Sequence, residues 1–134
     1  MDESTRTVDS DGTITYRNSL DQLHRVGGPA VEHVNGDKWW YINGRLHRVD
    51  GPAIEYANGT KFWHFNGQRH RIDGPAIEYA DGDKWWYFNN QHHRVDGPAI
   101  ERANGTKYYC YKDKQISKEI YLSDEFQVKI ILEG

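Results

Sequence analysis

Residues 47–69 read HRVDGPAIEYANGTKFWHFNGQR, and the expected fold of the whole chain follows from this stretch. Asn58-Gly59 separates two segments of β-forming residues, 53–57 and 60–65. An Asn-Gly pair between β-formers is the strongest short-range signal for a hairpin, because a type I′ turn needs positive φ at both central residues. The stretch therefore predicts one hairpin, followed by a longer connection over 66–74 that leads to the next strand.

The same pattern occurs four times along the chain. A His-Arg pair begins each copy at residues 24, 47, 70 and 93, so the copies repeat every 23 residues. An isolated hairpin is only marginally stable in water, and the copies are therefore expected to stack side by side. The expected hairpin turns are Asn35-Gly36, Asn58-Gly59, Asp81-Gly82 and Asn104-Gly105.

The chain divides into three parts. Residues 1–23 are predicted to form a tail and a degenerate cap hairpin, 24–115 the four repeats, and 116–134 a C-terminal cap. In the cap, the alternation of apolar residues over 126–132 suits a strand, whereas Ser123-Asp124-Glu125 is typical of a helix start. We expect a short capping helix. The predicted class is all-β, a single-layer antiparallel stack of β-hairpin repeats.

Composition limits the classes of function. Charged residues make up 28% of the 134 residues and aromatic residues 13%, which is too aromatic for a disordered chain and too polar for a membrane span. The net charge of −3 disfavours binding to nucleic acid or to an anionic membrane. The polar N-terminus does not resemble a signal peptide, and a single cysteine fits a reducing compartment. We therefore expect a soluble cytoplasmic protein.

The turn assignment predicts which side chains share a face of the sheet. With Asn58-Gly59 as the two turn residues, Ile54 pairs with Trp63 and Glu55 pairs with Phe62. The face that carries Ile54 and Trp63 is the more apolar one and is predicted to be buried. Its equivalent pairs in the other copies are Val31–Trp40, Ile77–Trp86 and Ile100–Tyr109.

The opposite face is predicted to carry a second aromatic row with glutamates beside it. These side chains could pack across strands or under other parts of the chain, or they could form an exposed row. Exposed apolar patches of this extent are typical of interaction sites. The candidate binding residues are Trp39, Tyr41, Phe62, His64, Trp85, Tyr87, Tyr108, Glu55 and Glu78.

The His-Arg-x-Asp segment gives a second candidate site. In a structural role, Asp caps the Gly-Pro turn and Arg pairs with it or with a glutamate of a neighbouring copy. In a functional role, the arginines form a cationic row for phosphates or carboxylates, since the planar guanidinium matches those groups. The residues concerned are Arg48, Arg71, Arg94, His47, His70 and His93.

The sequence does not favour catalysis or a cofactor. Cys110 replaces an aromatic residue of the repeat and is expected to pack in the core rather than act as a nucleophile. His92 and His93 are adjacent, but neighbouring strand residues point to opposite faces and no Cys/His ligand spacing is present. We therefore predict no metal, no cofactor and no enzymatic activity.

The 23-residue hairpin unit, rich in Gly, Tyr and Trp, resembles the MORN class of repeats. The run HR-V/I-DGPA, repeated over 24–115, is more similar still to repeat proteins of bacteriophage genomes. The first copy departs from the pattern with Gly27 in place of Asp, and the fourth has Lys112-Asp113 where Asn-Gly is expected. The resemblance implies a non-enzymatic binding scaffold, such as a phage accessory protein that inhibits a host factor.

Three classes of ligand follow from these candidate sites. The leading hypothesis is a protein partner that docks on the aromatic face. The second is a nucleotide signal held between aromatic rings and the arginine row. The third is choline or sugar binding by the Trp-Trp-Tyr segments.

Overall fold

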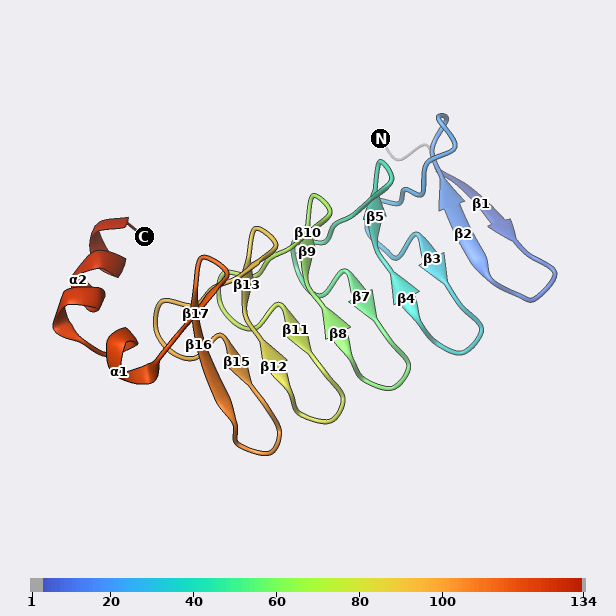
Figure 1. The fold of residues 1–134 in the computed structure, drawn as a ribbon. Coiled ribbons are helices and arrows are strands. Elements are labelled where there is room, and N and C mark those ends of the chain that lie inside the picture. Colours follow the sequence, from blue (N-terminus) through green and yellow to red (C-terminus); the bar gives the residue numbers. More distant parts are fainter. Residues whose placement is uncertain (1–3, 134) are drawn as a thin grey trace.

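The structure is a computed structural model that describes residues 4–133. Its centre is one antiparallel sheet of 11 strands, in which the hairpins of successive copies lie side by side between the N-terminal hairpin and the C-terminal helices (Figure 1). This confirms the predicted all-β hairpin stack. In order across the sheet, the strands are β1 (Thr5–Val8), β2 (Ile14–Arg17), β3 (Val31–Glu32), β4 (Lys38–Trp39), β7 (Ile54–Glu55), β8 (Lys61–Phe62), β11 (Ile77–Glu78), β12 (Lys84–Trp85), β15 (Ile100–Glu101), β16 (Lys107–Tyr111) and β17 (Lys114–Ile116).

Each copy also forms a second hairpin, so the expected long connection over 66–74 is wrong in its first part. There, β9 (His64–Phe65) pairs with β10 (Gln68–Arg69) across Asn66-Gly67. Both turn residues have positive φ, 51° at Asn66 and 82° at Gly67, as a type I′ turn requires. The equivalent pairs are β5 (Tyr41–Ile42) with β6 (Arg45–Leu46) and β13 (Tyr87–Phe88) with β14 (Gln91–His92).

The first turn of the copy is a three-residue loop instead of the expected two-residue turn. Tyr56 N–H donates to the Thr60 carbonyl oxygen at 2.9 Å, which closes the loop over 57–59. Within this loop only Gly59 has positive φ, at 95°. These features define a type I turn followed by a glycine bulge. The two strands consequently pair one residue away from the predicted register.

This one-residue shift exchanges the partners on the two faces of the sheet. Ile54 lies opposite Phe62 and not opposite Trp63, and Glu55 lies opposite Lys61. The Val/Ile row therefore shares a face of the sheet with Phe62 and its equivalents. The sequence predicts instead that it shares this face with Trp63 and its equivalents. The pairs predicted in the remaining copies are wrong for the same reason, and the observed pairs are Val31–Trp39, Ile77–Trp85 and Ile100–Tyr108.

The core is built from small clusters that recur along the stack. Ala76 and Ile77 are 0% and 1% exposed, and they pack with Tyr87 and Trp85. Burying an isoleucine side chain contributes roughly 1.5–3 kcal/mol. The buried alanine also joins two copies, because Trp63 N–H of the preceding copy donates to the Ala76 carbonyl oxygen at 2.7 Å. Packing and hydrogen bonding therefore both depend on the neighbouring copy.

Two helices, α1 (Lys118–Tyr121) and α2 (Asp124–Glu133), follow the last strand. The Ser117 side chain caps α1 by accepting a hydrogen bond from Ile120 N–H at 3.3 Å. The predicted C-terminal helix is thus confirmed, although it is preceded by a second short one. In the part of the chain that the structure describes, no helix is long and apolar enough to cross a membrane.

Candidate functional site

The segments between successive hairpin pairs, here called connector loops, line one side of the molecule. Connector loops 1 to 4 cover residues 24–29, 47–52, 70–75 and 93–98. Loops 2 to 4 each join the second hairpin of one copy to the first strand of the next, so they occupy successive positions along the stack (Figure 1). The His-Arg-x-Asp segments are therefore placed in a row.

The arginine of each loop is held by its own copy and by an aromatic residue of the preceding one. Arg71 Nε donates to Asp73 at 3.2 Å. Its Nη1 donates to the Pro75 carbonyl oxygen at 3.1 Å and to Glu78 at 2.8 Å. The guanidinium carbon lies 3.9 Å from the centre of the Trp63 ring, a cation–π distance. The equivalent contacts join Arg48 to Asp50, Pro52, Glu55 and Trp40, and Arg94 to Asp96, Pro98, Glu101 and Trp86.

These contacts favour a structural role for the arginine row. Arg71 faces two carboxylates, so the set of Arg, Asp and Glu carries a charge of −1 (+1 −1 −1). A Cβ added to Gly74 would lie 2.9 Å from Arg71 Cζ, which explains why glycine follows the aspartate. The Arg48 guanidinium, hydrogen-bonded to Asp50, holds the pKa of that carboxyl below its usual value. The protein's own carboxylates thus already neutralise the cationic row.

The histidine of each loop ties the loop to the second turn of the same copy. His47 Nδ1 accepts a hydrogen bond from Asn66 N–H at 3.0 Å, and His70 Nδ1 accepts one from Asn89 N–H at 3.0 Å. Nδ1 must be unprotonated to accept these bonds, which fixes a neutral ring with its proton on Nε2. Burial lowers the pKa of His70, which favours that neutral form. The other two histidines make the same bond, His24 to Asn43 and His93 to Lys112.

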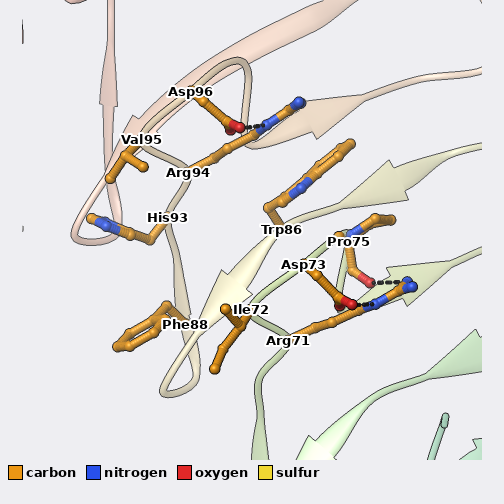
Figure 2. A pocket seen from close by; sticks show the side chains of 11 residues that line it. Arg71, Ile72, Asp73, Pro75, Trp86, Phe88, His93, Arg94, Val95 and Asp96 are labelled. Atoms are coloured by element: carbon orange, nitrogen blue, oxygen red, sulfur yellow. Dashed lines mark hydrogen bonds and ion pairs between the residues drawn. The ribbon is translucent and has the colours of Figure 1, made fainter.

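Three open clefts lie between successive connector loops. Cleft 3, of about 500 Å³, is bounded by loops 3 and 4, with Trp86 and Phe88 between them (Figure 2). Neighbouring clefts are roughly 10 Å apart, because each copy adds two strands that are spaced about 4.8 Å apart. Cleft 2, of about 680 Å³, has Trp63 and Phe65 in the equivalent positions, and cleft 1, of about 480 Å³, has Trp40 and Ile42.

Apolar side chains are exposed along this row of clefts. The β-branched residue after Arg is 81% exposed at Val49 and 85% at Ile72, while Phe65 and Phe88 are 47% and 45% exposed. The neighbouring Asp73 side chain is 87% exposed, so the apolar groups have an acidic rim. Exposed apolar groups that are rimmed by polar residues are typical of interaction surfaces. The clefts and this rim form the candidate site.

A ladder of rings holds the exposed phenylalanines in place. The ring centres of His47 and Phe65 are 4.5 Å apart, and those of His70 and Phe88 are 4.4 Å apart. Longer contacts of 6.4 Å from Phe65 to His70 and 6.1 Å from Phe88 to His93 continue the ladder. The histidines that bind the second turns therefore also fix the aromatic rings at the clefts.

The aromatic row proposed from the sequence lies elsewhere, on the side of the sheet that carries the Val/Ile row. It packs across strands, as in the contact of 5.3 Å between the ring centres of Tyr79 and Trp85. Glu55 and Glu78 lie on the other side and bind Arg48 and Arg71, so the prediction that they flank the aromatic row is wrong. The aromatic row consists of Trp39, Tyr41, Phe62, His64, Trp85, Tyr87 and Tyr108. None of these seven side chains is exposed.

Titratable groups on this inner side are kept neutral. Burial, aided by the positive charge of Arg69, lowers the pKa of His64 to about 4. Burial and the nearby Asp113 raise the pKa of the Cys110 thiol, which disfavours the nucleophilic thiolate. Within the described residues, no group of three or more His, Cys, Asp or Glu side chains is placed to hold a metal ion.

The sequence interpretation missed the exposed residues at the clefts, above all Val49, Ile72 and Phe65. A signal was present. Each connector carries a valine or isoleucine after its arginine, and in loops 2 to 4 an aspartate follows it, at a position where a loop has no core to join. An aliphatic residue that recurs in a polar loop is therefore better interpreted as a contact residue than as part of the core.

Neither protein-family models nor curated proteins give a match to this chain. The resemblance to MORN repeats and to phage repeat proteins stays a prediction.

Proposed function

We propose that this chain is a non-enzymatic binding protein that docks a partner protein along its row of connector clefts. The observation that carries the proposal is the set of three equivalent clefts, each with an exposed aliphatic residue at its edge. A protein partner suits a row of this length, because a small molecule would fill only one cleft. In line with the resemblance to phage repeat proteins, the partner is a host factor.

Charge defines the surface that such a partner would present. Each Arg-Asp-Glu set has a charge of −1, and the Asp50 and Asp73 side chains are 85% and 87% exposed. A partner with apolar side chains for the clefts and basic side chains around them would be complementary to this rim. The apolar anchors are expected to supply most of the affinity, and the rim charges the orientation and the rate of association.

A nucleotide ligand gains less support from the geometry. Phosphate recognition uses guanidinium donors, but Nε and Nη1 of Arg71 already donate to Asp73, Pro75 and Glu78. A phosphate would also approach a site whose Arg-Asp-Glu set carries a negative charge. The protein-binding function is therefore the better supported of the two.

The proposal is tested by comparing exposed aliphatic residues on two sides of the molecule. A tagged V49S/I72S variant is compared with the wild type and with V34S, since Val34 is also strongly exposed, at 72%, but lies in a first turn away from the clefts. Partner capture from an extract of the native host is measured by quantitative mass spectrometry. Capture should persist with V34S and be lost with V49S/I72S. Equal capture by all three proteins would exclude the clefts as the docking surface.

A further inference from the structure

The fourth connector loop differs from the others, because the chain itself fills the space beside it. Tyr121 of α1 is 1% exposed, and its hydroxyl donates to the Arg94 carbonyl oxygen at 2.6 Å. The same hydroxyl accepts a hydrogen bond from Gly97 N–H at 3.3 Å. The centre of the Tyr121 ring lies 4.8 Å from that of Tyr109, which occupies in copy 4 the position of Trp86 in copy 3.

The rest of the C-terminal segment completes this cover. Phe126 contacts Tyr111 with ring centres 5.4 Å apart, and Ile130 belongs to the same cluster. Tyr111 is only 5% exposed, whereas Phe88 at the equivalent position of copy 3 is 45% exposed. Val95 of loop 4 is 41% exposed, against 85% for Ile72 of loop 3. The helices therefore cover in copy 4 the surface that copies 2 and 3 leave open.

The polar groups that bind the Tyr121 hydroxyl recur in the open clefts. Arg71 and Gly74 line cleft 3, and Arg48 and Gly51 line cleft 2. The loops have the same local geometry, since a Cβ added to the glycine would lie 2.9 Å from the arginine Cζ in loops 2 and 3 and 2.8 Å in loop 4. Among residues 4–133, no protein group hydrogen-bonds to these two arginine carbonyl oxygens or to these two glycine N–H groups.

A carbonyl oxygen beside an N–H group selects for a ligand atom that both donates and accepts a hydrogen bond. A phenolic hydroxyl does both, whereas an ammonium group only donates and a carboxylate only accepts. The apolar surroundings, Ile72 and Phe88 in cleft 3, favour a ring behind that hydroxyl. The ring position of Tyr121 itself is not open in cleft 3, because Arg94 stacks on Trp86 at 4.0 Å where Tyr121 stacks on the equivalent Tyr109. An incoming ring is therefore expected to lie against Phe88 and the aliphatic edge and to share only the hydroxyl contacts of Tyr121.

We propose that clefts 2 and 3 each accept a tyrosine side chain from a helical segment of the partner protein, with the Tyr121 hydroxyl as the chain's own example of the hydrogen bonds that hold it. The proposal rests on the proposed function and names the partner's chemistry. Residues seven apart on a helix are separated by about 10.5 Å, which matches the distance of roughly 10 Å between clefts. A helix with two tyrosines seven residues apart and basic residues between them would therefore fit both clefts and their acidic rim.

The probe is a synthetic helical peptide built from alanine and lysine, about 20 residues long so that it is helical in water, with two tyrosines seven residues apart. One control peptide has phenylalanine in place of both tyrosines, and a second has the tyrosines five residues apart. Amide NMR signals of the full-length protein report where each peptide binds. Gly97 is the internal reference, because its N–H is already bound to Tyr121.

The tyrosine peptide should shift the Gly51 and Gly74 signals in a saturable way and leave Gly97 unchanged. The phenylalanine peptide should bind at least about tenfold more weakly, because it cannot form the hydrogen bonds of the two hydroxyl groups. The peptide with five-residue spacing should bind through one cleft only. Equal affinity of the tyrosine and phenylalanine peptides, shifts confined to other residues, or no binding at millimolar peptide would overturn the tyrosine proposal.

These outcomes are separable from those of the capture experiment. If V49S/I72S abolishes partner capture while the phenylalanine peptide binds as well as the tyrosine peptide, the clefts dock a partner but do not select tyrosine. If capture is unaffected by V49S/I72S while the tyrosine peptide still shifts Gly51 and Gly74, the clefts bind tyrosine and the proposed function is wrong.

Discussion

Acidification is expected to destabilise this protein through His64, and the His64→Tyr variant isolates the effect. His64 is 8% exposed, and its pKa is lowered from 6.5 to about 4 by burial and by the charge of Arg69. Tyrosine is the natural replacement, because Tyr41 and Tyr87 occupy this position in the neighbouring copies. The variant keeps a ring in the core and removes the group that titrates.

The sign and size of the effect follow from proton linkage. Because the pKa is lower in the folded state, the unfolded chain binds more protons between pH 6.5 and 4. Stability is therefore complete above pH 6.5 and is lost as the pH falls towards 4. A difference of 2.5 pKa units (6.5 − 4) corresponds to roughly 3 kcal/mol in total. At intermediate pH the same relation gives a loss of about 1.4 kcal/mol at about pH 5.5 and about 2.5 kcal/mol at about pH 4.5.

Urea unfolding followed by tryptophan fluorescence measures this loss at a series of pH values. The other histidines are common to both proteins, so their contributions cancel in the difference between the wild type and His64→Tyr. When the pH is lowered from about 7.5 to about 4.5, the unfolding free energy of the wild type should fall by about 2.5 kcal/mol more than that of the variant. If the two curves of unfolding free energy against pH run parallel, the burial argument for His64 is refuted.

Two further predictions test the core. Ile77→Ala removes a side chain that is 1% exposed and should cost about 2–5 kcal/mol of unfolding free energy. Ile72→Ala, at a position that is 85% exposed, should change the unfolding free energy by less than about 0.5 kcal/mol. Urea unfolding measures both, and similar losses would contradict the sides of the molecule assigned to these two residues. The Cys110 thiol, buried and with a raised pKa, should react with iodoacetamide far more slowly in the folded protein than in urea, and equal rates by mass spectrometry would show that it is accessible.

The hairpin repeat could be predicted from sequence, but the register of its strands could not. Asn58-Gly59 suits both a two-residue type I′ turn and a three-residue loop that ends in glycine. The choice depends on stacking, because Ala57 N–H donates to Asp37 Oδ1 of the preceding copy at 2.7 Å. In the two-residue turn, that N–H would bond to Thr60 within its own hairpin. The same contact recurs from Ala80 to Thr60 and from Ala103 to Asp83.

The candidate site could be predicted only in part for a related reason. The sequence correctly places Arg71 beside Asp73, since the two residues are close in the chain. The contact of Arg71 with Trp63, and the exposure of Ile72 beside it, depend on which face each aromatic row takes. An error of one residue in the register moves a whole row to the opposite side. The sequence therefore assigns the inner row to the less apolar face, where packing and exposure are both open, and it does not indicate the connector side as an apolar surface.

Because the connector loops are equivalent, adding or removing one copy would change the number of clefts that can bind a partner. Excision of residues 47–69 would join Leu46 directly to His70, so that one histidine would replace another. The ladder of rings would then be shorter by one His–Phe pair. Duplication of the same segment would lengthen the ladder by one such pair. Because linked anchors multiply their individual affinities when the geometry lets them engage together, the number of copies in the gene becomes a coarse control of binding strength.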